Sequence, residues 1–399
     1  MARPKIRLNG FEEEWSNGIF STYAKPYFVS NKLIHHQNLL SLSYGKIVRK
    51  DIKANKGLLP ASFDTYQIIK DGIIVFRFTD LQNDHKSLRV GLSKEEGIIS
   101  PAYVCVECEN IKPEFFYLQL HTFDLRKYFY SMGDGMRQTL TYNDIKDMFI
   151  YVPILDEQKK IVTYFNRLDN NIEKEEEKLL KLKQMKSACL VSMFPQEGET
   201  KPRVRFNGFE EEWEKIRLGK LTEKVNRKAT PNSNAPVMMI SAASGFIEQS
   251  EKYSSDNAGQ SLINYILLKE GELAYNHGAS KIRIYGSCFD LKIPEARIPF
   301  VYHAFRMRED NPVFYAYYLN SGVFDSALRK LVSSTARMDG LLNISYDAYM
   351  SISVLKPSIL EQQRIASFFS TLDTQISLQE HRLEKLKQIK SACLDKMFV

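Results

Sequence analysis

A segment of 38 residues occurs twice in this chain, and no other feature of the sequence restricts the possible fold as strongly. Residues 157–194 return 204 positions later as residues 361–398, with 20 of the 38 positions identical. A shorter leader repeats as well, since residues 3–15 match residues 201–213 at 9 of 13 positions. The residues between leader and long segment match far less well. The chain therefore consists of two copies of one unit, with similar scaffolds and divergent globular segments.

Each long repeat has the apolar spacing of a coiled-coil helix, with apolar residues at alternating intervals of four and three. Polar residues interrupt both stripes at matching positions, Glu175 and Lys186 in the first and Gln379 and Lys390 in the second. One such stripe would also suit a surface helix on its own domain, but two in one chain favour helices that pair with each other. The residues assigned to helix pairing are Ile161, Phe165, Leu168, Ile172, Leu179, Leu182, Ile365, Phe369, Leu372, Ile376, Leu383 and Leu386.

The repeats predict a cyclic order of leader, globular segment and helix. At about 1.5 Å per residue each helix would be roughly 57 Å long and would act as a spacer. If a pseudo-two-fold axis relates the copies, the helices form an antiparallel coiled coil. The expected divisions are a leader (1–15), a first globular domain (16–153), a spacer helix (154–194), a linker with the second leader (195–213), a second globular domain (214–356) and a second spacer helix (357–399).

Both globular segments have the pattern of an α/β fold. Apolar runs of strand length are separated by Gly, Asp and Asn, and a helix is expected to begin at Pro113 and at Pro312, since proline is favoured in a first helical turn. The expected strands are 39–42, 66–69, 73–78 and 98–105 in the first segment and 237–241, 265–268, 272–275 and 282–285 in the second.

Composition places the chain among ordinary globular proteins, with 44% hydrophobic and 26% charged residues. It has neither an apolar N-terminal signal peptide nor a window long and apolar enough to span a membrane, so we expect a cytoplasmic protein. The net charge of +7 permits a polyanionic partner without requiring one. Cys105 and Cys108 form a C-x-x-C pair, but no second pair follows at zinc spacing, so no metal site is expected.

Catalytic motifs are missing from the sequence. Gly45-Lys46 and Gly219-Lys220 lack the hydroxyl residue and the upstream glycine of a phosphate-binding loop. No glycine-rich dinucleotide motif follows a strand, and Asn311-Pro312 fits a helix start better than a methyltransferase signature. We therefore expect a protein that binds rather than catalyses.

Polar and basic side chains gather instead in three loops that recur at equivalent places in both globular segments. Such side chains contact base edges or hold phosphates, although each loop alone also fits ordinary solvated surface. The candidate DNA-binding residues are Ser43, Tyr44, Lys46, Arg49, Lys50, Arg77, Thr79, Asn83, His85, Lys86, Arg89 and Arg137 in the first segment and Ser241, Ser244, Asn276, His277, Ser280, Lys281, Arg283 and Arg337 in the second.

Three scaffold motifs together resemble the specificity subunit of type I restriction-modification systems. They are the leader N-G-F-E-E-E-W, the P-x-x-x-E-Q pattern at the start of each long helix (153–158 and 357–362), and the helix end K-Q-x-K-S-A-C-L-x-x-M-F. The resemblance covers the whole chain, strongly in the scaffold and weakly in the globular segments. The first leader departs from the pattern, because Ser16-Asn17-Gly18 stands where the second leader continues into a charged stretch.

The resemblance implies a non-catalytic subunit that binds double-stranded DNA for host defence and DNA methylation. Two target-recognition domains would each read one half of a bipartite, non-palindromic site, and the paired helices would set the gap between the halves. The partners implied are two methyltransferase subunits and two restriction subunits, with S-adenosylmethionine, ATP and Mg²⁺ held by those partners. The alternatives are a coiled-coil scaffold that presents two modules to a protein or glycan, and an enzyme with an unrecognised active site.

Overall fold

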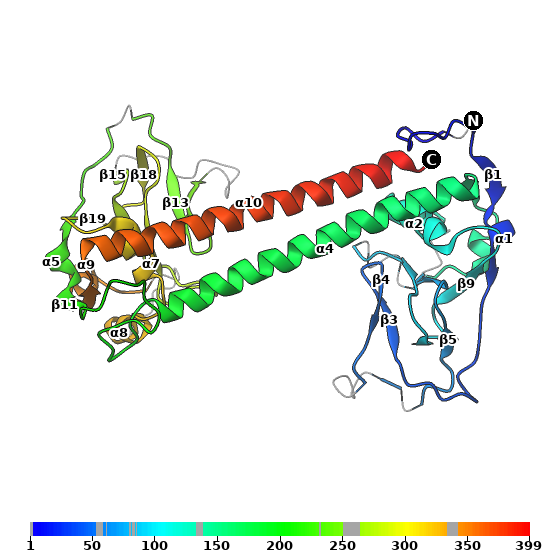
Figure 1. Ribbon diagram of the computed structural model, residues 1–399, viewed down its shortest axis with the longest axis horizontal. Coiled ribbons are helices and arrows are strands. Elements are labelled where there is room, and N and C mark those ends of the chain that lie inside the picture. Colours follow the sequence, from blue (N-terminus) through cyan, green and yellow to red (C-terminus); the bar gives the residue numbers. More distant parts are fainter. Residues whose placement is uncertain are drawn as a thin grey trace. The chain divides into compact units, whose positions relative to one another are not determined.

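The structure is a computed structural model that describes residues 3–52, 59–60, 62–79, 81, 84, 86–132, 139–230, 233–249, 264–332 and 342–399. The chain forms two compact units: the first consists of Met1–Glu176 with His381–Val399, and the second of Glu177–Glu380. Each long helix is divided between the units, so each unit holds a piece of both (Figure 1). Within the described ranges, no helix has the length and apolar character needed to cross a membrane.

The first unit alternates short strands and helices. Its elements are β1 (Ser16–Ile19), α1 (Phe20–Tyr23), β2 (Ala24–Pro26), β3 (Leu40–Ser43), β4 (Lys46–Arg49), β5 (Gln67–Ile69), β6 (Ile74–Phe76), β7 (Val90–Leu92), β8 (Gly97–Ile99), β9 (Val104–Cys108), α2 (Pro113–Leu125), the 3₁₀ helix η1 (Tyr128–Ser131), α3 (Tyr142–Ile145), β10 (Phe149–Val152) and the first part of α4 (Leu155–Ser192).

The second unit repeats this order closely. Its elements are β11 (Glu214–Arg217), α5 (Leu218–Leu221), β12 (Thr222–Lys224), β13 (Met238–Ser241), β14 (Gly245–Glu248), β15 (Ile266–Lys269), β16 (Leu273–Asn276), β17 (Ser287–Asp290), β18 (Glu295–Ile298), β19 (His303–Met307), α7 (Pro312–Leu319), α8 (Asp325–Leu331), α9 (Tyr346–Met350), β20 (Ser353–Lys356) and the first part of α10 (Ile359–Met397).

The sheets of the two units have the same topology. A four-stranded antiparallel sheet has the order β2-β9-β6-β7 in the first unit and β12-β19-β16-β17 in the second. Three two-stranded pairs accompany it, β1-β10, β3-β4 and β5-β8, with β11-β20, β13-β14 and β15-β18 as their counterparts. The expected class, two α/β units with two long helices, is confirmed.

The central strand of each sheet is buried on both faces. Ile74 and Phe76 of β6 pack with α2 in one core cluster, while Val75 faces a second cluster that includes Leu40 of β3. In β16, Leu273 and Ala274 likewise point into different clusters. A strand covered on both sides is apolar at consecutive positions, which is why these runs stand out in the sequence.

Two of the strand predictions are wrong. Residues 98–105 form two strands, β8 and β9, because Pro101 fixes a turn in which the N–H of Tyr103 donates to the carbonyl of Ser100 at 3.1 Å. Residues 282–285 form no strand. Ile282 is 63% exposed, so its apolar character reflects no buried face.

Proline at 113 and at 312 begins a helix in each unit, as predicted. The second of these helices is shorter than the first, since α7 ends at Leu319 and α8 begins at Asp325. Gly322, with φ 89°, takes the chain through the left-handed conformation between them.

The pieces of α4 and α10 pair in antiparallel fashion within each unit. In the first unit Asp169 pairs with Lys390 and Glu176 with Lys387, so the partner number falls as the residue number rises. The second unit has the equivalent pairs, Asp373 with Lys186 and Glu380 with Lys183. The helix-pairing residues of the sequence analysis are buried or half-buried in these pieces.

Each leader is fastened to the start of a long helix by a buried ion pair. Arg7 donates two hydrogen bonds to Glu157, at 2.8 and 2.7 Å, and Arg205 donates two to Glu361, both at 2.7 Å. The hydrogen bonds with Glu157 raise the pKa of Arg7, and those with Glu361 raise that of Arg205. Two parallel bonds between arginine and carboxylate fix orientation as well as distance.

The glutamine that follows each of these glutamates holds the adjacent helix. Gln158 accepts from the N–H of Lys112, the N-cap of α2, at 2.9 Å and donates to the carbonyl of Pro153. Gln362 makes the same pair of bonds with Asn311, the N-cap of α7, and Pro357. The Glu-Gln pair of the sequence motif therefore joins the leader, the long helix and the proline-started helix.

The aromatic residue that ends each long repeat completes the core of the unit. Phe398 packs 6.2 Å from the ring of Trp15 and 5.7 Å from that of Phe115. Phe194 packs equivalently, 6.5 Å from Trp213 and 5.7 Å from Phe314. The C-terminus thus packs beside the first leader, which is the cyclic arrangement that the repeats suggest.

Breaking the leader ion pair should destabilise the first unit. In Glu157→Gln the guanidinium of Arg7, 15% exposed, loses its countercharge, and we expect the free energy of unfolding to fall by about 3 kcal/mol. Urea unfolding followed by a probe in the first unit measures the change. Asp156→Asn removes the neighbouring, exposed partner of Lys159 and should leave the midpoint unchanged. Equal effects of the two changes would contradict the anchoring role.

Candidate nucleic-acid interface

The hairpin β3–β4 places an exposed aromatic ring at its tip. Tyr44 (φ 46°) and Gly45 (φ 76°) both have positive φ, as a two-residue type I′ turn requires. Tyr44 is 74% exposed, and a bulky residue in this conformation is strained. The hydroxyl of Tyr117 on α2 donates to the carbonyl of Gly45 at 3.1 Å and holds the turn. The strained, exposed tyrosine favours a binding role for this tip.

The other candidates on this hairpin divide by their partners. Ser43, Lys46 and Lys50 are exposed, and neither lysine makes an ion pair within the part of the chain that the structure describes. Arg49 pairs with Glu95 at 2.6 Å, and the hydrogen bond from Arg49 lowers the pKa of that carboxyl. The two lysines are therefore better placed than Arg49 to meet a phosphate.

The loop between β6 and β7 contains both exposed and buried candidates. Arg77 and Thr79 are half-buried and Lys86 is exposed. Arg89 is completely buried, so its assignment as a DNA-contacting residue is wrong. Its backbone carbonyl accepts from the N–H of Arg77 at the end of β6, and its side chain donates inward to the carbonyls of Thr79 and Asp84 and to the hydroxyl of Tyr130. Asn83, His85 and Arg137 lie outside the described residues.

The corresponding loop of the second unit lies between β16 and β17. Lys281 is exposed, and Ser280 accepts from the N–H of Arg283 at 3.0 Å. Arg283 is half-buried, and burial lowers its pKa. Asn276 is occupied within the fold, since its amide donates to the carbonyl of Ile240 and accepts from the N–H of Gly278. Arg337 lies outside the described residues.

His277 is buried, and this corrects its assignment as a surface residue that contacts DNA. Its ring nitrogens lie 2.6 Å from the carbonyl of Leu342 and 2.9 Å from that of Val301. The ring also stacks on His303 with centroids 5.1 Å apart. Burial lowers the pKa of His303. His277 therefore fastens the base of the loop to two neighbouring segments.

A cleft of about 810 Å³ opens in the second unit beside the hairpin β13–β14. Ser244 and Gly245 of the hairpin, Ala316 of α7 and Ser370 of α10 are among its lining residues. Ala316 occupies the place that Tyr117 holds on α2, counted from the initial proline. The smaller side chain leaves this hairpin without the equivalent of the Tyr117 bridge, so the two hairpins are supported differently.

Burial perturbs two groups of α2 in opposite directions. It lowers the pKa of His121 to about 4, assisted by nearby Lys390, and the Nδ1 of this ring has no partner in the described structure. It raises the pKa of Asp124 to about 6, although one oxygen of that carboxylate accepts from the N–H groups of Arg89 and Val90. No sequence pattern identifies these supporting residues, because they occupy ordinary helix positions.

Among the described residues, His, Cys, Asp and Glu form no cluster of three or more that would bind a metal ion. Burial raises the pKa of Cys105 and of Cys108 to about 12, so both thiols keep their protons. What the described surface offers is a set of lysines, hydroxyls and an exposed tyrosine on loops.

Comparison with known proteins shows what this arrangement is similar to. Residues 89–184 match the family model described as the type I restriction modification DNA specificity domain. No curated protein sequence matches the chain. Among solved structures, the S subunit of a type I restriction-modification system from M. genitalium aligns over 100% of this chain and 99% of its own, with TM-score 0.57 and 15% identity. A chain from a study of complex assembly in the type I restriction-modification system aligns over 97% and 98%, with TM-score 0.50 and 16% identity.

The stability of the first unit should depend on pH through His121 and Asp124, the two groups of α2 whose pKa values are shifted. His121 has a lower pKa folded than unfolded, so its contribution to stability falls as pH drops below about 6.5 and is constant below about 4. Asp124 has a raised folded pKa, so its contribution is lost as pH rises from about 4 to about 6. The two effects oppose each other, and the wild-type curve alone would show neither.

Substitution of His121 separates its effect on stability from that of Asp124. Relative to wild type, His121→Asn should gain about 2 kcal/mol of unfolding free energy between pH 7.5 and pH 5, measured by urea unfolding of the first unit. Tyr117→Phe is the control: burial raises the pKa of Tyr117 to about 12, so this change should cost the same at both pH values. A His121→Asn curve parallel to that of wild type would contradict the assignment.

Proposed function

We propose that this chain, whose resemblance to the specificity subunits of type I restriction-modification systems is confirmed, is the subunit that recognises double-stranded DNA in such a complex. The matched segment runs from the start of β7 into α4, and the fold of the whole chain is that of an S subunit. The basic net charge of +7 suits a polyanionic ligand.

The main support for the proposal is the difference between the loops of the two units. The two units share one strand order, yet the loops at equivalent places carry different side chains. The β3–β4 tip presents Tyr44 and Lys46, while the β13–β14 tip presents Ser244. Two equal frames with different loops suit a protein that reads two different sequences, so each unit would read one half of a bipartite, non-palindromic site. Lysines on such loops would hold phosphates and Arg77 would read a base.

The long helices would serve assembly and spacing. The paired helices would set the unread gap between the two half-sites, and the scaffold would bind two methyltransferase subunits and two restriction subunits. The chain itself would be non-catalytic. S-adenosylmethionine, ATP and Mg²⁺ would belong to the partner subunits, and the assembled complex would act in the cytoplasm.

Exchange of a globular domain tests this directly. Replacing residues 16–153 by the equivalent segment of a related specificity subunit should change the bases of one half-site and leave the other half intact. Mapping of methylated adenines in cells that carry the complete system measures both halves. A methylation pattern altered in both halves would rule out independent reading, and a wild-type system without any bipartite pattern would favour a scaffold for another ligand.

Point changes should separate phosphate contacts from base contacts. Lys50→Ala should weaken binding to all sequences alike and reduce the salt slope by about one unit, because one phosphate contact is lost. Arg77→Ala should cost about 1–3 kcal/mol at one base position and relax specificity there. Binding titrations of the complete complex on matched and mismatched duplexes distinguish the two. The same sequence-independent loss in both variants would exclude base reading by Arg77.

A further inference from the structure

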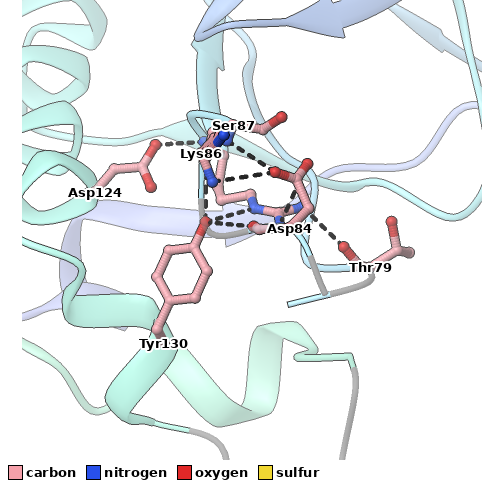
Figure 2. Close-up of polar contacts among 7 residues, drawn as sticks. Thr79, Asp84, Lys86, Ser87, Asp124 and Tyr130 are labelled. Carbon is pink, nitrogen blue, oxygen red and sulfur yellow. Dashed lines mark hydrogen bonds and ion pairs between the residues drawn. The ribbon is translucent and has the colours of Figure 1, made fainter. Parts of the chain in front are cut away.

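The buried Arg89 lies at the centre of a hydrogen-bond cluster that shapes the β6–β7 loop. Its guanidinium donates to the carbonyl of Thr79 at 2.8 Å, to the carbonyl of Asp84, and through Nε to the hydroxyl of Tyr130 at 3.1 Å. Figure 2 shows the side chain of Tyr130 reaching from η1 toward the loop that carries Thr79 and Asp84. One side chain therefore ties both limbs of the loop together.

The cluster extends from the guanidinium into the backbone of the loop. The hydroxyl of Tyr130 lies 3.0 Å from the carbonyl of Asp84 and 3.2 Å from that of Ser87. The side-chain hydrogen bond of Ser87 is the main cause that lowers the pKa of Asp84 to about 2. The carboxylate of Asp84 also accepts from the N–H groups of Lys86 and Ser87. From the other side, Asp124 of α2 accepts from the N–H of Arg89 itself.

The charge of Arg89 is expensive to bury, since it is 0% exposed. The carboxylate of Asp84 lies 3.7 Å away, and the other bonds described for this guanidinium go to two backbone carbonyls and the hydroxyl of Tyr130. A planar guanidinium donates to several acceptors in fixed directions, whereas a lysine ammonium or an apolar residue would not satisfy this set. Such a buried network specifies one conformation of the chain around it.

The second unit forms the same sheet without this arginine. The strand pairing makes Ser287 the counterpart of Arg89. Arg77, at the end of β6, lies opposite Arg89, and Asn276, at the end of β16, lies opposite Ser287 in the same register. There Asn320 holds the strand instead, accepting from the N–H of Cys288 at 3.0 Å. Since the common frame folds without the guanidinium, the arginine serves the particular loop of the first unit.

We propose that Arg89 is a positioning residue for DNA recognition. Its bonds to Thr79 and Asp84 would hold the described residues of the β6–β7 loop where Arg77, Thr79 and Lys86 meet the first half-site. The inference rests on the proposed function. Arg89 itself touches no DNA. It acts through the loop backbone, and Tyr130 and Asp84 are its partners in this role.

The test uses the full chain in its complex with the methyltransferase subunits and a pool of random-sequence duplexes. Methylated duplexes are sequenced, and base preference is scored separately in the half-site assigned to residues 16–153 and in the other half. Arg89→Lys keeps the charge and loses the planar fork. We expect its preference to fall about tenfold in the first half-site, as one lost or distorted base contact would give, and to stay within about twofold in the second.

Two further variants keep the test decisive. Tyr130→Phe removes a single hydroxyl of the cluster and should relax the same half-site to a smaller extent, even if Arg89→Lys does not fold. Arg126→Lys, at the end of the same helix as Asp124 but bonded to the carbonyl of Asp395, should change neither half-site. Thermal unfolding of each complex shows which variants are folded.

Failure of the positioning role and failure of the proposed function give different results. Folded Arg89→Lys and Tyr130→Phe complexes with wild-type preference in both halves would overturn the positioning role, as would an equal loss in both halves, which indicates a purely structural residue. A wild-type complex that selects no bipartite sequence would overturn the proposed function, and the inference with it.

Discussion

In each unit a bidentate ion pair joins the leader to the start of a long helix. Glu157 and Glu361 are buried carboxylates, and each requires its arginine, because an unpaired charge in that place would be costly. The neighbouring glutamine links the same helix start to the N-cap of α2 or α7. These few bonds join segments far apart in the chain, so the leader, the sheet and the helix pair form one body in each unit.

The frame made by these contacts leaves the loops free to differ. Four-stranded sheets of equal order stand in both units, but the hairpin tip of the first is bridged by Tyr117, whereas the second has Ala316 and a cleft. The loop after the central strand is held by Arg89 in one unit and by His277 in the other. Each of these loops thus has its own internal support.

The candidate site was less predictable than the scaffold. Counting polar residues on a loop correctly identifies Lys46, Lys50 and Lys281 as exposed, yet the same reasoning places Arg89 and His277 on the surface, where they are not. The strand expected at 282–285 fails for a related reason, because two isoleucines that alternate with polar residues look like a buried face while both are exposed. Alternation shows what a segment would bury in a sheet, and it does not show that a sheet is there.

The duplication, the two long helices, the α/β class and the helix starts at Pro113 and Pro312 can be predicted from the amino-acid sequence, because they depend on local propensity and on periodicity within single segments. Which polar side chains face inward depends on tertiary packing. Burial of Arg89 depends on acceptors at Thr79, Asp84 and Tyr130, and burial of His277 on carbonyls at Val301 and Leu342. The packing of separate elements brings these partners together, so no pattern within one segment predicts which polar side chain will be buried.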